Sequence, residues 1–161
     1  MKYNYPKNRR KIDLDWGDYD NLVREIFTKV KNYQPDVIVA NCRGGLPLGV
    51  HLAHLLGIGT QNFGCVTIVR HIDDKIASDL INPLTKGLLL PNIKDKKVLI
   101  TEDTVGAGET LETIRSLLKN DGPKEIRATC LFLNERNLNK DWIDYGKVST
   151  DKDWIIFPWE K

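Results

Sequence analysis

The chain has 161 residues, of which 41% are hydrophobic and 29% charged, and its formal net charge is +2 at pH 7. This length suits a single domain with a sizeable core, so we expect residues 1–161 to fold as one unit. The nearly balanced charge gives no support to a nucleic-acid groove or a polybasic membrane surface, and no apolar run reaches the length that spans a bilayer.

The N-terminal part of the chain carries a basic arm, KNRRK at residues 7–11. Such an arm is usually a solvated, mobile end, and contact with RNA, DNA or a partner protein is the alternative. From Asp18 onward apolar residues recur at helical spacing, and Pro35 closes the segment. The residues expected on the buried face of this helix are Leu22, Val23, Ile26, Phe27 and Val30.

Two apolar strands with a helix between them are predicted next. DVIVAN at residues 36–41 indicates a strand that CRGGLP interrupts, and a second helix then ends at Gly57. FGCVTIVRH at residues 63–71 is the following strand. The region that comes after it, about 71–95, has no clean periodicity, and we interpret it as a mobile loop of the kind that is often functional in compact domains.

The C-terminal half continues the alternation of strands and helices. A strand over 97–101, a helix over 110–120 and a strand over 125–133 precede two short extended pieces, DYGKVS and DWIIFPWE. This order predicts an α/β fold with a central, mainly parallel sheet flanked by helices. Ligands of such sheets bind at the carboxyl ends of the strands, so we expect three polar segments to converge there. These segments are residues 41–43, 102–103 and 134–135.

The stretch VLITEDTVGAGETL, residues 98–111, carries the clearest chemical signal. Backbone amides that follow a strand and open a helix form an anion site, and Gly106 and Gly108 allow a phosphate to approach closely. Glu102 and Asp103 would repel a phosphate, but they suit sugar hydroxyls or a hard cation such as Mg²⁺. The alternative is an ordinary strand–turn–helix connection in which the acids cap the helix.

This stretch resembles the phosphoribosyl-diphosphate (PRPP) motif of the type I phosphoribosyltransferases, where strand, acid pair, glycine loop and threonine keep a common register. NCRGGLPLG at residues 41–49 is similar to the pyrophosphate loop of that family. DWIIFPWE resembles the base-covering hood of its bacterial and archaeal xanthine-guanine branch. The resemblance spans about residues 15–160. It implies the type I phosphoribosyltransferase fold with a small hood, formed by about residues 134–161 and the N-terminal segment.

The resemblance also implies roles for the residues around PRPP. Glu102 and Asp103 are expected to hold the ribose hydroxyls and to bind Mg²⁺, and Glu160 is expected to help hold a second Mg²⁺ on the pyrophosphate side. Arg43 is expected to stabilise the departing pyrophosphate. The complete pyrophosphate subsite would be Arg43, Gly44 and Gly45. The 5-phosphate subsite would be Gly106, Ala107, Gly108, Glu109 and Thr110.

On the base side, the resemblance implies that Trp154 stacks on the nucleobase and that the backbone of Ile155 contacts its edge. Two positions depart from the purine branch. Gly106 stands where an Asp normally faces the purine N7, and Asn134 stands where a Lys normally donates to the 6-oxo group. Because an Asn amide both donates and accepts, Asn134 is compatible with an oxo or an amino group.

These expectations describe a PRPP-dependent phosphoribosyltransferase that joins a nucleobase, expected to be a 6-oxopurine, to ribose 5-phosphate in purine salvage. Its partners would be PRPP, the base and the nucleoside monophosphate product, and the family resemblance leads us to expect a homodimer or homotetramer. Two alternatives stay open: a phosphoribosyltransferase for another or modified base, and a non-catalytic sensor of PRPP or nucleotides. The three cysteines have no paired spacing and the first 15 residues are too polar for a signal peptide, so we expect a cytoplasmic protein.

Overall fold

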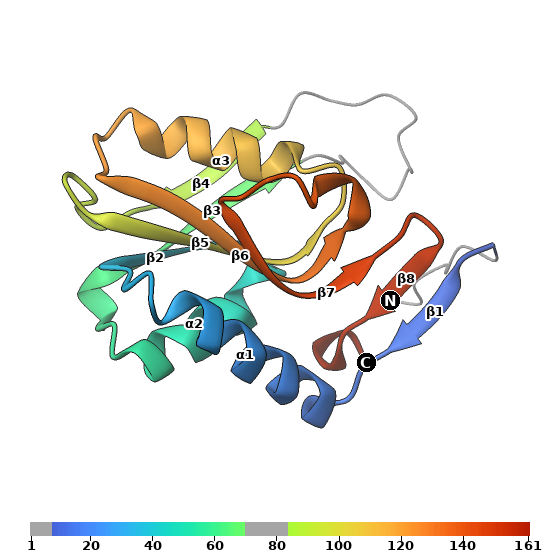
Figure 1. Ribbon diagram of the computed structural model, residues 1–161. Coiled ribbons are helices and arrows are strands. Elements are labelled where there is room, and N and C mark those ends of the chain that lie inside the picture. The colour runs from blue at the N-terminus through green and yellow to red at the C-terminus, as the bar shows by residue number, and fades with distance from the viewer. Residues whose placement is uncertain (1–7, 70–83) are drawn as a thin grey trace.

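The computed structural model describes residues 8–69 and 84–161 of the chain, and Figure 1 shows how they are arranged. Within these ranges six strands form one sheet in the order β4-β3-β2-β5-β6-β7, and β4 alone runs antiparallel to its neighbour. This confirms the predicted α/β fold. The strands of this sheet are β2 (Val37–Asn41), β3 (Phe63–Val69), β4 (Leu84–Leu89), β5 (Lys97–Val105), β6 (Glu125–Asn134) and β7 (Ile143–Ser149).

Helices cover both faces of the sheet: α1 (Trp16–Val30) and α2 (Gly45–Leu56) lie on one face, and α3 (Glu109–Lys119) lies on the other (Figure 1). The helix α2 ends at Gly57 as predicted, because that glycine adopts a left-handed φ of +70°. None of the helices in the described ranges has the length and apolar character needed to span a bilayer. Among the described residues there are also three short 3₁₀ turns: η1 (Thr60–Asn62), η2 (Glu135–Asn137) and η3 (Pro158–Glu160).

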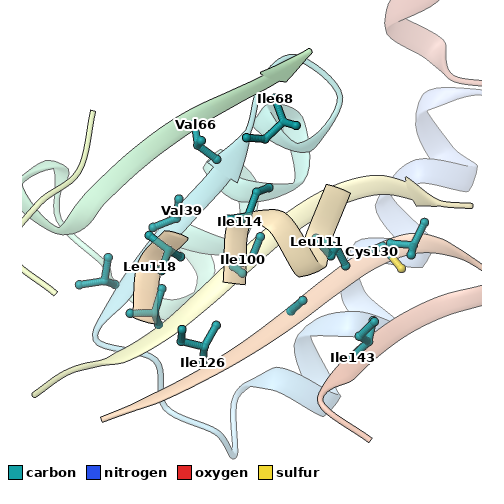
Figure 2. Packing of buried hydrophobic residues seen from close by; sticks show 14 of the residues in the cluster. Val39, Val66, Ile68, Ile100, Leu111, Ile114, Leu118, Ile126, Cys130 and Ile143 are labelled. Carbon is teal, nitrogen blue, oxygen red and sulfur yellow. The ribbon is translucent and has the colours of Figure 1, made fainter. Parts of the chain in front are cut away.

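The side chains of the central strands alternate between two apolar clusters, one on each face of the sheet. Val39 and Ile100 belong to the cluster that contains Ile114 of α3, which Figure 2 shows from close by. Ile38 and Leu99, the neighbours of those residues in the chain, belong to the cluster under α1 and α2. Because both faces of these strands are buried, the strands appear in the sequence as continuous apolar runs.

The strand β5 is longer than its apolar sequence predicted. The prediction ended it at Thr101, whereas the structure continues it to Val105, so that Glu102 and Asp103 lie inside the strand. The reason is that β6 runs parallel beside it and pairs as far as Val105 with Leu133. Backbone pairing with a long neighbour therefore outweighs the poor strand propensity of two acids.

The predicted mobile loop over 71–95 lies only partly within the described residues. Residues 70–83 are outside them, and Leu84–Leu89 form β4, so the prediction of an irregular loop is wrong over that range. β4 pairs antiparallel with β3 at the edge of the sheet. Its sequence, LTKGLL, contains a glycine and no regular alternation, and its strand conformation therefore depends on this pairing.

A second, two-stranded parallel sheet consists of β1 (Arg10–Asp13) and β8 (Asp153–Ile156), and we call it the hood. Figure 1 shows it at one end of the molecule, beside the start of α1. The prediction of a mobile basic arm is wrong for Arg10 and Lys11, which lie in β1. The Arg10 guanidinium forms a salt bridge of 2.6 Å with the buried Asp153 carboxylate, and this fixes the pair of strands.

Candidate active site

The carboxyl ends of β2 and β5 come together as the parallel sheet requires. The side-chain amide of Asn41, the last residue of β2, donates a hydrogen bond to the Glu102 carboxylate, and both side chains are buried. Just beyond Asn41, the chain turns into α2 so closely to β5 that a Cβ atom at Gly44 would overlap the Asp103 carboxylate. The predicted pyrophosphate loop and the predicted acid pair are therefore neighbours.

Glu102 is a buried carboxylate with few groups to stabilise its charge. Burial raises its pKa well above the usual range, and the nearby charge of Asp103 raises it further. Two donors oppose this effect: the Asn41 amide and the backbone N–H of Asp103, which lies 3.0 Å from Glu102 Oε1. The pKa of Glu102 is raised overall, because two hydrogen bonds stabilise the carboxylate less than a neighbouring cation would.

Asp103 is half-buried and is also destabilised as an anion. Burial raises its pKa, the Thr104 N–H opposes this from 2.5 Å, and the charge of Glu160 adds to the increase. Glu160 itself accepts a hydrogen bond of 2.9 Å from the Phe157 N–H in η3. No group of three or more His, Cys, Asp or Glu side chains within residues 8–69 and 84–161 is arranged to hold a metal ion by itself.

The predicted pyrophosphate loop is a tight connection between β2 and α2. The Cys42–Arg43 peptide bond is cis, and the Arg43 side chain is exposed at the carboxyl end of the sheet. A Cβ atom at Gly45 would overlap the carbonyl oxygen of Thr101, so the loop backbone lies directly against β5. Glycine is needed at both Gly44 and Gly45 because β5 leaves no room for a side chain.

A pocket of about 110 Å³ opens at the predicted 5-phosphate loop, several times the roughly 10–15 Å³ that one water molecule needs. Gly108 precedes α3 with a φ of +87°, and no side chain caps the helix, so its first backbone N–H groups are available to an anion. Glu109, an acid, occupies the first helical position. The pocket is lined by Glu102, Thr104, Val105, Gly106, Ala107, Gly108, Thr110 and Leu111.

The three residues predicted to bind the base lie in two elements. Asn134 ends β6 and is 5% exposed, and its amide donates to Asp151 over 3.0 Å while its oxygen accepts from the Arg136 N–H over 3.2 Å. Trp154 and Ile155 are half-buried in β8 of the hood. The Arg9 guanidinium lies over the Trp154 ring, 5.6 Å from its centroid. The base-binding roles stay predictions. Within the described residues, the two side-chain hydrogen bonds of Asn134 do not use its second amide hydrogen.

Sequence reasoning missed residues that hold the site from neighbouring loops. The Asn137 amide donates to the carbonyl oxygen of Gly106 over 2.6 Å, and Asp151 accepts hydrogen bonds from both Asn134 and Arg136. These residues lie in irregular segments where polar side chains are common, so neither periodicity nor a motif distinguishes them.

The phosphoribosyl transferase domain family matches residues 15–160 of the chain. No curated protein sequence matches it significantly. Among solved structures, a purine phosphoribosyltransferase from Pyrococcus horikoshii is 29% identical, with a TM-score of 0.73 and 94% of each chain covered.

Two further solved structures share the fold at lower identity. The xanthine-guanine-hypoxanthine phosphoribosyltransferase of Helicobacter pylori is 20% identical, with a TM-score of 0.72 and 94% of each chain covered. A hypothetical protein from Neisseria gonorrhoeae with bound ppGpp is 18% identical, with a TM-score of 0.72, and the alignment covers 95% of this chain and 90% of that one.

Proposed function

Because the chain belongs to the phosphoribosyl transferase family, we propose that this phosphoribosyltransferase uses PRPP and transfers its 5-phosphoribosyl group to a nucleobase, releasing pyrophosphate. We propose a 6-oxopurine as the base and purine salvage as the setting. The names of the similar archaeal and Helicobacter enzymes support a purine, and the hood sequence supports the same branch.

One observation carries the proposal: the glycine-lined pocket at the start of α3 adjoins the buried acids of β5. Glu102 and Thr110 line the same pocket, so hydroxyl acceptors and an anion site are adjacent. PRPP requires this combination, because its 5-phosphate and its ribose hydroxyls lie at neighbouring positions of one small molecule. An ordinary strand–turn–helix connection requires neither two buried acids nor an uncapped helix.

In the proposed reaction a ring nitrogen of the base bonds to C1 of the ribose as the C1–O bond to pyrophosphate breaks, and the base loses a proton. The loop amides and Thr110 bind the 5-phosphate, while Glu102 and Asp103 hold the ribose, on which positive charge develops at C1. Arg43 and the amides of Gly44 and Gly45 bind the pyrophosphate. The protein acts by positioning and electrostatic stabilisation, with no covalent intermediate.

The residues of the site also suit Mg²⁺. Within the described ranges no ion pair involves Glu102 or Asp103, and burial raises the pKa of both carboxyls, so a cation there would relieve an uncompensated charge. Mg²⁺ binds through one or two carboxylates together with substrate phosphates, so it requires no complete cage of protein ligands. We propose that Glu102 and Asp103 would hold Mg²⁺ and that Glu160 would help to hold a second ion on the pyrophosphate side. These ions would supply positive charge to the pyrophosphate.

A specific observation favours an alternative base. Asn134 uses one amide hydrogen and its oxygen within the protein, and Gly106 offers no side chain to the purine N7. A site of this kind also fits a base other than a 6-oxopurine, or a modified one. A non-catalytic sensor of PRPP or nucleotides is the remaining alternative.

A turnover assay separates these possibilities. The protein is incubated with Mg²⁺, PRPP and, in turn, guanine, hypoxanthine, xanthine, adenine and uracil, and pyrophosphate release is followed. Turnover of a 6-oxopurine is the expected result. Turnover of another base alone would favour the alternative substrate, and PRPP binding without any turnover would favour the sensor.

Calorimetry of Thr110→Val tests the phosphate site separately. The variant keeps the shape of the side chain and removes its hydroxyl, and the loss of one hydrogen bond to a charged group should weaken PRPP binding by about 1.5–3 kcal/mol. Thr113→Val is the matched control, because Thr113 lies on the same helix, is half-buried, does not line the pocket, and donates to the Glu109 carbonyl oxygen. Equal PRPP affinity in the two variants would contradict the proposed phosphate site.

A further inference from the structure

The segment between β6 and β7 contacts the glycine loop that follows β5. Asn137, in η2, is 2% exposed, and its amide donates to the Gly106 carbonyl oxygen over 2.6 Å. This bond joins the loop after β5 to the loop after β6. A buried amide with one short bond to the backbone holds that carbonyl in a single orientation.

The Asn137 side chain also lies close to Gly108, at the other end of the loop. Gly108 has a φ of +87°, and a Cβ atom there would lie 2.7 Å from Asn137 Oδ1. Asn137 therefore contacts the loop at both Gly106 and Gly108. Contacts at both glycines restrict the backbone conformation of the loop that lines the pocket.

Lys140 adds a charge to this support. Its Nζ donates to Glu112 Oε1 over 2.6 Å and would lie 3.3 Å from a Cβ atom at Gly108. Glu112 belongs to the first turn of α3, where its negative charge alone would disfavour a phosphate. The ion pair offsets that charge beside the loop.

We propose that Asn137 is a positioning residue for the 5-phosphate subsite, and that Lys140 neutralises the acid next to it. This inference rests on the proposed function, which assigns the loop to the 5-phosphate of PRPP. Asn137 acts through the backbone it orients, so its removal should affect ligands that carry the 5-phosphate and spare a ligand that binds only at Arg43, Gly44 and Gly45.

The test compares two ligands in one variant. Calorimetry with Mg²⁺ measures the affinities of Asn137→Ala for PRPP and for pyrophosphate, which lacks the 5-phosphate. We expect PRPP binding to weaken about tenfold, as for the loss of one buried hydrogen bond, and pyrophosphate binding to stay within about twofold of the parent. Asn139→Ala is the control, since Asn139 is an exposed asparagine of the same segment and should leave both affinities unchanged.

Circular dichroism checks that each variant is folded, and Asn137→Ser, whose hydroxyl is too short to reach Gly106, serves if the alanine variant does not fold. Equal PRPP affinity in the parent and the Asn137 variant would overturn this inference and leave the proposed function standing. Equal weakening of both ligands would show a general structural role and would also overturn it. Absence of PRPP binding by the parent would overturn the proposed function and, with it, this inference.

Discussion

The pKa values of the buried acids are shifted in opposite directions in the hood and in β5. In the hood, burial alone would raise the pKa of Asp153, but the Thr150 N–H at 2.8 Å and Arg10 hold it below its usual range. In β5, burial raises the pKa of Glu102 and Asp103, and no cationic side chain of the described residues pairs with either. Groups of the chain itself thus compensate the charge of Asp153. The charges of Glu102 and Asp103 have no such partner among the described residues, so a ligand can compensate them.

This difference gives the two regions opposite pH dependence. A carboxyl whose pKa is lowered on folding stabilises the protein above its unfolded pKa, near 3.9 for Asp, and that stability is lost as the pH falls through the folded pKa. A carboxyl whose pKa is raised on folding destabilises the protein increasingly as the pH rises above its unfolded value, near 4.3 for Glu. Asp153 belongs to the first kind and Glu102 to the second.

Removing one charge from β5 is the strongest test of the difference between the acids of the hood and those of β5. Asp103→Asn keeps the shape of the side chain, and we expect turnover to fall roughly 10²–10³-fold, because the ribose and cation side of the site loses a preorganised charge. Pyrophosphate release measures this, and circular dichroism should show an unchanged fold. Asp13→Asn makes the same chemical change in the hood and should leave turnover near that of the parent. Similar losses in both variants would contradict the distinction.

The position of Asp103 should depend on the glycine that packs against it. Gly44→Ala places a methyl group on the Asp103 carboxylate, and we expect turnover to fall up to roughly 10²-fold as the acid is displaced. Gly17→Ala in α1 is the matched change, because among the described residues a Cβ atom there would meet only Asp15 Oδ1, at 3.1 Å, and it should keep turnover within about threefold. Similar losses in both variants would contradict the placement of Asp103 in the site.

In the hood, the expected effect is on stability rather than on turnover. Asp153→Asn should lower the free energy of unfolding at pH 7 by about 1–3 kcal/mol, since Arg10 loses its partner and Thr150 loses a charged acceptor. Urea unfolding at several pH values measures this. The difference between parent and variant should shrink as the pH falls through the lowered pKa of Asp153. A difference that is independent of pH would contradict the charge pairing.

The opposite change in stability is expected in β5. Glu102→Gln should raise the free energy of unfolding by about 0.5–2 kcal/mol at pH 8, because a buried charge is removed. The new amide can donate to Asn41 Oδ1, which is buried and has no hydrogen-bond partner among the described residues, once the Asn41 amide turns over. The gain should vanish as the pH falls below about 4, where the parent carboxyl becomes protonated in both the folded and the unfolded state. A loss of stability at pH 8 would show that the carboxylate is already compensated.

The order of the central elements could be predicted because glycine and proline bound the apolar runs and both faces of the sheet are buried. β1 could not, since RKID has no strand pattern and becomes a strand only beside β8, 143 residues further along the chain. The end of β5 was misjudged for a related reason, because its final residues are held by β6.

The candidate site, like the fold, could be predicted only in part. The acids and the glycine loop are local in the sequence, and the rule that parallel strands bring their carboxyl ends together places them beside residues 41–45. Asn137 and Asp151 could not be found in this way. Their contacts join separate loops, and a single sequence carries no signal for which polar loop residue turns inward.

The long separation of β1 and β8 bears on how the protein is made and how it opens. On the ribosome β1 emerges long before its partner, and the entire six-stranded sheet is synthesised in between. The hood is therefore the last unit to assemble. With only four residues in each strand, it should also be among the least protected of the described elements in hydrogen exchange. We therefore expect Trp154 to lie on a unit that opens sub-globally while the sheet that carries the acids stays folded.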